Sequence, residues 1–251
     1  GAPLASNVLN EEENYSDNVE EGFIKVAKLN PDLGGEPLEI IMSPNRQSYG
    51  RFGYDIFLAS KDSSIAGGRI LLISAPGENS SSGVVYPYTV TETLGTVSVQ
   101  SFASYIVPSG ISQSLAGTSI TGNETGELIA ISAPGVNNET GAVYVYSLNT
   151  STYSLTQSVI NAPEICKPGD KFGQKILMTK DGNYLFVTST LVSTANVKPG
   201  KVFAYKWIDN QFILHQTLDN PTSEKKMNFG FNLTVDSLGQ TLVVTGKGDS
   251  Q

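Results

Sequence analysis

Reactive and metal-binding side chains are scarce in this chain. Its 251 residues include one cysteine, Cys166, and one histidine, His215. A single cysteine excludes an internal disulfide, and the two residues cannot supply the four nitrogen and sulfur ligands of a usual structural zinc site. They could act as nucleophile and base only if the fold brought the two side chains together. We therefore identify no catalytic residue and expect a protein that is not an enzyme.

Basic side chains and long apolar runs are also scarce. Lysine and arginine number 16 against 24 aspartates and glutamates, which gives a net charge of −8. A nucleic-acid groove or a site for an anionic membrane surface needs a basic patch, so neither partner is expected. No apolar run approaches the roughly 20 residues that cross a bilayer, so we predict no membrane insertion. The phosphate-binding motifs GxxxxGK[ST] and GxGxxG are absent as well.

Glycine (25 residues) and proline (12) are plentiful, as in turn-rich all-β domains. The stretch from Leu128 to Tyr146 shows the pattern most completely. Its first part, Leu128 to Ile131, is a short apolar run that predicts a strand covered on both faces. Ser132 to Gly135 ends that strand, because proline cannot donate to a sheet and glycine accepts positive φ. A polar loop, Val136 to Thr140, then leads to a second strand, Ala142 to Tyr146, with alternating tyrosines.

Copies of this hairpin recur along the chain. They run from Leu71 to Tyr88 and from Tyr184 to Tyr205, with part-copies at Gly1 to Val26 and Thr241 to Gly246. A second motif, a dipeptide that ends in glycine, lies upstream of each of the last four copies. These anchors are Phe52-Gly53, Ala116-Gly117, Phe172-Gly173 and Phe229-Gly230. The anchor glycines are spaced by 64, 56 and 57 residues, and the glycines that open the later strands, Gly22, Gly83, Gly141 and Gly200, by 61, 58 and 59. A shared period slightly above 50 residues indicates β-propeller blades rather than a helical solenoid.

The predicted fold is therefore an all-β propeller of four-stranded antiparallel blades with about 57–60 residues each. In the first complete blade the expected strands are Asp55–Ser60, Arg69–Ser74, Val84–Tyr88 and Thr96–Phe102. Lys180 to Asn183 predicts a tight Asp-Gly hairpin turn in a later blade. All blades would form one domain, with these divisions: 1–48, a part-blade with an acidic loop; 49–107, 108–168 and 169–226, whole blades; and 227–251, the start of another.

Three whole blades and two part-blades indicate that this chain is part of a larger propeller, because propellers usually need 4–8 blades to close. A four-bladed ring closed by pairing the two part-blades is the alternative. The tyrosines and phenylalanines fall mainly on strands, and we predict that they pack between blades rather than form a platform for carbohydrate.

The order of motifs resembles the FG-GAP repeat of integrin α-subunit β-propellers and their bacterial and protist relatives. The residues that carry the resemblance are Phe52, Gly53, Ala75, Pro76, Ala133, Pro134, Gly141, Phe172, Gly173, Phe229 and Gly230. Integrin-like blades often hold calcium in an Asp-x-Asp-x-Asp-Gly loop between the first two strands. The matching loops here are Lys61–Ser64, Gly122–Thr125, Lys180–Asn183 and Asp236–Gly239. None offers more than two carboxyl or amide ligands at that spacing, so we predict no cofactor and no calcium.

Six Asn-X-Ser/Thr sequons are candidate glycosylation sites: Asn14, Asn79, Asn123, Asn138, Asn149 and Asn232. They favour a location outside the cell or on its surface. Our first hypothesis is a non-enzymatic structural or adhesion module, a glycoprotein that presents loops to a protein or glycan partner. The presenting loops would be Leu4–Glu21, Gly77–Ser82, Val136–Thr140 and Leu191–Pro199. The alternatives are a virion or appendage subunit that self-assembles through open sheet edges, and the propeller domain of a larger hydrolase.

Overall fold

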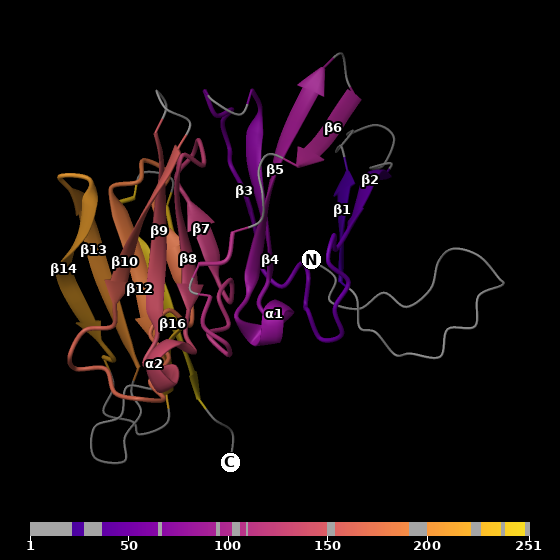
Figure 1. Ribbon diagram of the computed structural model, residues 1–251. Coiled ribbons are helices and arrows are strands. Elements are labelled where there is room, and N and C mark those ends of the chain that lie inside the picture. The colour runs from indigo at the N-terminus through magenta and orange to yellow at the C-terminus, as the bar shows by residue number, and fades with distance from the viewer. Residues whose placement is uncertain are drawn as a thin grey trace.

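The computed structural model describes residues 22–27, 37–64, 67–93, 96–101, 106–108, 110–149, 154–190, 200–221, 227–236 and 239–248. This part of the chain is all-β. Three four-stranded antiparallel sheets lie between two two-stranded ones (Figure 1). The all-β class and the four-stranded antiparallel sheets predicted from the sequence are confirmed.

The strands follow one another in chain order. The first sheet contains β1 (Phe23–Ala27) and β2 (Pro37–Met42). The second contains β3 (Ile56–Leu58), β4 (Arg69–Ala75), β5 (Val84–Thr93) and β6 (Thr96–Ser101). The third contains β7 (Ile120–Gly122), β8 (Leu128–Ala133), β9 (Ala142–Asn149) and β10 (Ser154–Asn161). The fourth contains β11 (Ile176–Met178), β12 (Tyr184–Ser189), β13 (Lys201–Ile208) and β14 (Gln211–Asp219). The fifth contains β15 (Met227–Val235) and β16 (Leu242–Gly248).

Each four-stranded sheet is a meander, in which every strand pairs with the next one along the chain. The strand lengths differ from those predicted. β3 covers only Ile56–Leu58; just before it, the backbone N–H of Asp55 bonds the side-chain hydroxyl of Ser74 on β4 instead of a backbone carbonyl. β5 continues past the predicted end at Tyr88 to Thr93, because it goes on pairing with β6 after β4 has ended. The predicted hairpin at Lys180–Asn183 is present, with Gly182 at φ +75° and no positive φ at Asp181.

Each gap between successive sheets is filled by its own apolar cluster. On β4, Ile70 and Leu72 belong to the cluster shared with the third sheet, whereas Leu71 and Ile73 belong to the cluster shared with the first sheet. The alternation of side chains along a strand produces this division. It explains why the second strands read as unbroken apolar runs, since both of their faces are covered.

Aromatic rings join these clusters, as the sequence predicted. Phe52 is 2% exposed and meets Tyr86 edge to face, with ring centroids 5.6 Å apart, in the cluster that also holds Ile24 of the first sheet. Phe172 meets Phe203 in the same way at 5.5 Å, between the third and fourth sheets. The Phe of the Phe-Gly anchor is therefore a core residue of the contact between sheets.

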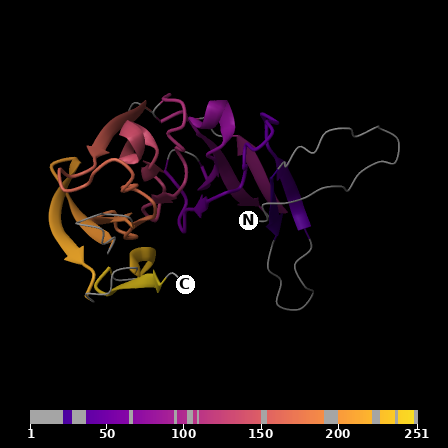
Figure 2. The same cartoon turned by 90° about the horizontal axis from the view of Figure 1, so that it is seen from below.

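Seen from below, the sheets follow one another along a curved path from the first sheet to the fifth (Figure 2). The first strands of neighbouring sheets lie next to each other on this path, β3 beside β7, β7 beside β11, and β11 beside β15. The first strands of the sheets, β3, β7, β11 and β15, thus lie next to one another along the arc.

The glycine that opens the third strand touches the anchor of the next sheet. An added Cβ on Gly141 would lie 2.0 Å from the carbonyl oxygen of Phe172, and one on Gly83 would lie 2.0 Å from that of Ala116. Gly141 also has φ +96°, which L side chains rarely adopt. These positions need glycine for two reasons, the backbone conformation and the closeness of the neighbouring sheet.

Two alanine variants separate the two reasons. Gly169 has φ +89° but open space around its Cβ position. We expect Gly169→Ala to lower the free energy of unfolding by about 1–2 kcal/mol, the cost of the left-handed conformation. Gly141→Ala should cost at least about 2 kcal/mol more, because it also forces the third and fourth sheets apart. Urea unfolding measures both losses, and equal losses would show that the sheet contact contributes nothing.

Candidate functional site

The turns that follow the two Ala-Pro motifs carry a left-handed backbone. In α1 (Glu78–Ser81) the residues Asn79, Ser80 and Ser81 have φ between 53° and 60°. The same three positions of α2 (Val136–Glu139) have φ between 53° and 61°. The sequence predicted polar loops here, whereas the structure has regular single turns of this hand.

The left-handed backbone turns carbonyl groups toward the next sheet. The carbonyls of Ser80, Ser81 and Ser82 accept hydrogen bonds from the N–H groups of Gln113, Leu115 and Ala116 at 3.1, 2.9 and 3.3 Å. The carbonyls of the equivalent α2 segment, Asn138, Glu139 and Thr140, accept from Gly169, Lys171 and Phe172 at 3.1, 2.8 and 2.9 Å. Each turn is therefore tied through its backbone to the segment before the next Phe-Gly position.

One hydrogen bond repeats at the start of each first strand, and we call it the hydroxyl latch. In it, the backbone N–H two residues after the anchor glycine donates to a Ser or Thr hydroxyl on the second strand of the same sheet. The four pairs are Asp55 with Ser74, Ser119 with Ser132, Lys175 with Thr188, and Asn232 with Thr245, at 2.9, 2.8, 3.0 and 3.1 Å. Thr188 therefore supplies the hydroxyl even though the proline of its motif is lost.

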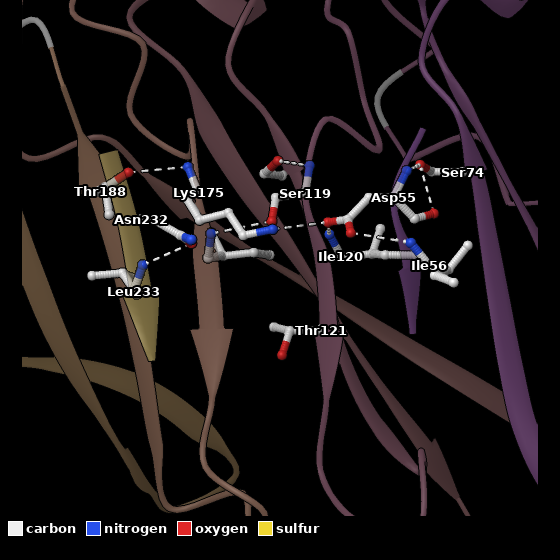
Figure 3. A network of polar contacts seen from close by, with 12 residues as sticks. Asp55, Ile56, Ser74, Ser119, Ile120, Thr121, Lys175, Thr188, Asn232 and Leu233 are labelled. Carbon is white, nitrogen blue, oxygen red and sulfur yellow. Dashed lines mark hydrogen bonds and ion pairs between the residues drawn. The ribbon is translucent and has the colours of Figure 1, made fainter. Parts of the chain in front are cut away.

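The side chains at these latch positions also reach between sheets (Figure 3). Asp55 Oδ2 accepts from the backbone N–H of Ile120 at 2.9 Å and lies 3.4 Å from Lys175 Nζ. Ser119 Oγ accepts from the N–H of Ile176 at 3.3 Å. The Asp55–Lys175 ion pair links the second sheet to the fourth across β7. Both groups are partly in water, so the bonds to backbone N–H hold this row together more than the ion pair does.

A pocket of about 120 Å³ opens beside the two left-handed turns. Its lining residues come from corresponding positions of three sheets: Arg51, Tyr54, Pro76, Leu115, Thr118, Pro134, Gly135, Glu139, Lys171 and Gln174. The residues that precede the Phe-Gly positions, Arg51, Leu115 and Lys171, all have positive φ, between 53° and 58°. The N–H groups of Tyr54, Thr118 and Gln174 bond back to their carbonyls at 3.0–3.1 Å, so each turn is fixed.

A buried carboxyl group lies at one end of the same face. The side chain of Glu78 is 0% exposed and receives hydrogen bonds from Ser43 Oγ at 3.0 Å, Asn45 Nδ2 at 3.3 Å and Tyr86 Oη at 2.5 Å. Burial raises its pKa above the ordinary value, and the three donors oppose that shift. Burial, together with the hydrogen-bonded Glu78 carboxyl group, raises the pKa of Tyr86. Glu78 thus joins the segment after β2 to the second sheet.

Sequence reasoning missed Glu78, although a signal was present. When the hairpins are aligned on Ala75-Pro76 and Ala133-Pro134, Glu78 falls opposite Val136, which is 4% exposed in its own cluster. A glutamate at a position that is apolar in the next copy points to a buried polar cluster. Arg51 and Tyr54 were missed as well, although a basic residue precedes Phe-Gly twice, at Arg51 and at Lys171.

The single cysteine and the single histidine lie in different surroundings. Cys166 is buried 4.0 Å from Ser189 Oγ, and burial raises the pKa of its thiol to about 11. His215 lies on β14 at the surface, with its ring against Tyr184. The structure does not bring the cysteine and the histidine together as nucleophile and base. Among the described residues no group of three or more His, Cys, Asp or Glu side chains is placed to hold a metal ion.

The sequons differ in their surroundings. Asn79 and Asn138 are exposed at the left-handed turns, and Asn232 is exposed on β15. Asn123 is half-buried and accepts the N–H of Leu128 through Oδ1 at 3.1 Å. Asn149 ends β9, and Asn14 lies outside the described residues, as do the predicted presenting loops Leu4–Glu21 and Leu191–Pro199.

Oxygen ligands in the loops compared with calcium sites bond within the protein. Asp181 accepts from Thr179 Oγ1 at 2.5 Å and from the N–H of Asn183 at 3.0 Å. Asp236 Oδ1 accepts from two backbone N–H groups at 2.7 and 3.2 Å, which lowers its pKa. Glu124 pairs with Lys61 at 2.7 Å. These carboxylates close turns or join neighbouring loops.

Comparisons with known proteins leave the chain unassigned. No protein-family model matches it, and no curated protein matches it. In the part of the chain that the structure describes, no helix has the length and apolar character needed to cross a bilayer.

Glu78 predicts how stability varies with pH. The unfolded chain ionises this carboxyl near the ordinary value of 4.5, while the folded chain keeps its proton to higher pH. The folded state therefore binds more protons above pH 4.5, and the contribution of Glu78 to stability, complete below that pH, declines as the pH rises through the folded pKa. Glu78→Gln should lack this decline. Urea unfolding of both proteins at several pH values measures it, and parallel pH profiles would contradict the assignment.

Calcium should have no effect on stability. Because the loop carboxylates close turns, we expect the melting temperature to be the same with a chelator, with calcium and with neither. Scanning calorimetry measures this. A clear fall in melting temperature on chelation would show that one of the loops is a calcium site.

Proposed function

We propose that the chain is a β-propeller module of the FG-GAP type that acts outside the cell, without catalysis, by presenting one face to a protein or glycan partner. Successive sheets join through two repeated contacts: the turn carbonyls and the glycine that touches the next anchor. Repetition of one junction along a curved path is the geometry from which a propeller is built.

The observation that carries the function is the rigidity of the turn face. The backbones of α1 and α2 are fixed by hydrogen bonds to the next sheet, while the side chains of Asn79, Ser80, Asn137 and Asn138 remain exposed. Fixed loops bind a partner with a smaller entropy cost than mobile ones. Polar groups held in this way suit recognition of a partner.

Assembly through sheet edges is a second candidate, favoured by a separate observation. In the complete sheets the second strand pairs with the third. By sequence β16 is a second strand and β1 is a third strand, and among the described residues each pairs with only one neighbour. The two free edges are complementary, so they suit self-assembly of a virion or appendage subunit.

Glycan mapping on the native protein tests the location. We expect the intact mass to fall on enzymatic deglycosylation, with glycans at Asn79 and Asn138, where the side chains are exposed, and none at Asn123, whose amide is engaged in its turn. Peptide mass spectrometry locates the glycans. A bare native chain would contradict passage through a secretory pathway and favour the assembly candidate.

Surface binding tests the function itself. The chain is immobilised and exposed to a panel of purified extracellular proteins and to a glycan array. We expect saturable binding to at least one member, and Ser80→Arg with Asn137→Arg should weaken it at least about tenfold by blocking the turn face. Gln211→Arg on the exposed strand β14 is the matched control. Binding that both variants leave unchanged would place the contact surface elsewhere.

A further inference from the structure

The pocket beside the turns contains a cation without a partner. The Arg51 side chain is exposed and makes no hydrogen bond or ion pair with any other described residue. Two acids lie on the same face, and both are engaged. Glu78 is buried with three donors on its carboxyl group, and Glu139 pairs with Lys171 at 3.4 Å. Among the residues that the structure describes, none pairs with the exposed Arg51 side chain, on a chain of net charge −8.

Two other polar groups of the pocket can also donate hydrogen bonds. The amide of Gln174 lines it, and the Lys171 ammonium keeps only a partly exposed, weak pair with Glu139. The Thr118 hydroxyl already donates to the carbonyl oxygen of Leu115 at 2.7 Å. An incoming carboxylate would find the five N–H donors of a guanidinium in a fork that matches its two oxygens.

The lining and size of the pocket limit what can enter. Its lining includes two buried prolines, Pro76 and Pro134, and the ring of Tyr54, which is 50% exposed. Its volume of about 120 Å³ is well below the roughly 300–1,000 Å³ of pockets for drug-sized ligands. One side chain fits this space, with its methylene groups on the proline rings and its charge at Arg51.

We propose that this pocket binds a single aspartate or glutamate side chain of a protein partner, held by Arg51 and assisted by Gln174. The proposal rests on the proposed function, because it names the chemistry that the turn face recognises. The backbone turns with positive φ at Arg51 and Lys171 hold these donors at fixed positions around the opening.

The experiment titrates the ¹⁵N-labelled chain with N-acetyl-Gly-Asp-Gly-amide and follows backbone amide resonances by NMR. We expect saturable shifts centred on Thr118 and Gln174, and none with the matching Asn peptide, which has the same shape without the charge. Arg51→Gln should weaken binding about ten- to hundredfold, the loss expected for a charged hydrogen-bonded pair. Arg51→Lys keeps the positive charge but loses the forked geometry of the guanidinium. Its affinity for the Asp peptide should lie between those of the wild type and Arg51→Gln.

Lys180→Gln is the matched control, because it removes one exposed positive charge at the opposite end of β11, and it should bind as the wild type does. Equal shifts with the Asn peptide, full binding by Arg51→Gln, or tighter binding of N-acetylneuraminic acid than of the Asp peptide would each overturn the proposal. If the chain then still binds a partner through the turn face, the proposed function stands and only the acidic-residue site fails. If no partner binds there but the Asp peptide does, the proposed function fails instead.

Discussion

The carbonyl groups of the two left-handed turns face the next sheet, and this orientation determines how the sheets meet. Ser80 to Ser82 and Asn138 to Thr140 each supply successive acceptors to the segment before the next Phe-Gly position. A right-handed turn would aim these groups differently and leave the donors unpaired in a crowded junction, at a cost of about 1–3 kcal/mol for each buried group. These backbone hydrogen bonds define how two neighbouring sheets are oriented. The glycines and buried aromatic rings between the sheets then fill the remaining contact.

The sequence predicted the repeated unit well, because its signals are local and occur several times. Ala-Pro marks the end of the second strand and glycine marks the start of the third, and the structure has β8 and β9 on either side of α2 accordingly. The unbroken apolar run of β4 correctly indicated burial on both faces, because side chains alternate between two clusters. Strand ends were less predictable, because a strand continues for as long as a neighbouring strand lies beside it to accept and donate hydrogen bonds. β5, for example, goes on pairing with β6 beyond the last residue that pairs with β4.

The candidate site could not be predicted from the sequence, because its residues gather from three sheets and none repeats as a reactive motif. Arg51 and Lys171 are basic and Leu115 at the same structural position is apolar, and only the fold shows that all three face one pocket. Glu78 is different. Its alignment with Val136 makes it visible as an exception within the repeat, although two of its three donors, Ser43 and Asn45, come from distant positions in the chain.

The junction made by each left-handed turn has a mechanical consequence. Three backbone hydrogen bonds lie side by side between Ser80–Ser82 and the following segment. A pull that slides one sheet past the next stretches all three bonds together, so they must break at once rather than one after another. A surface that holds on to a partner under tension gains from this arrangement, because the resistance comes from the backbone and is independent of which side chains the turn displays.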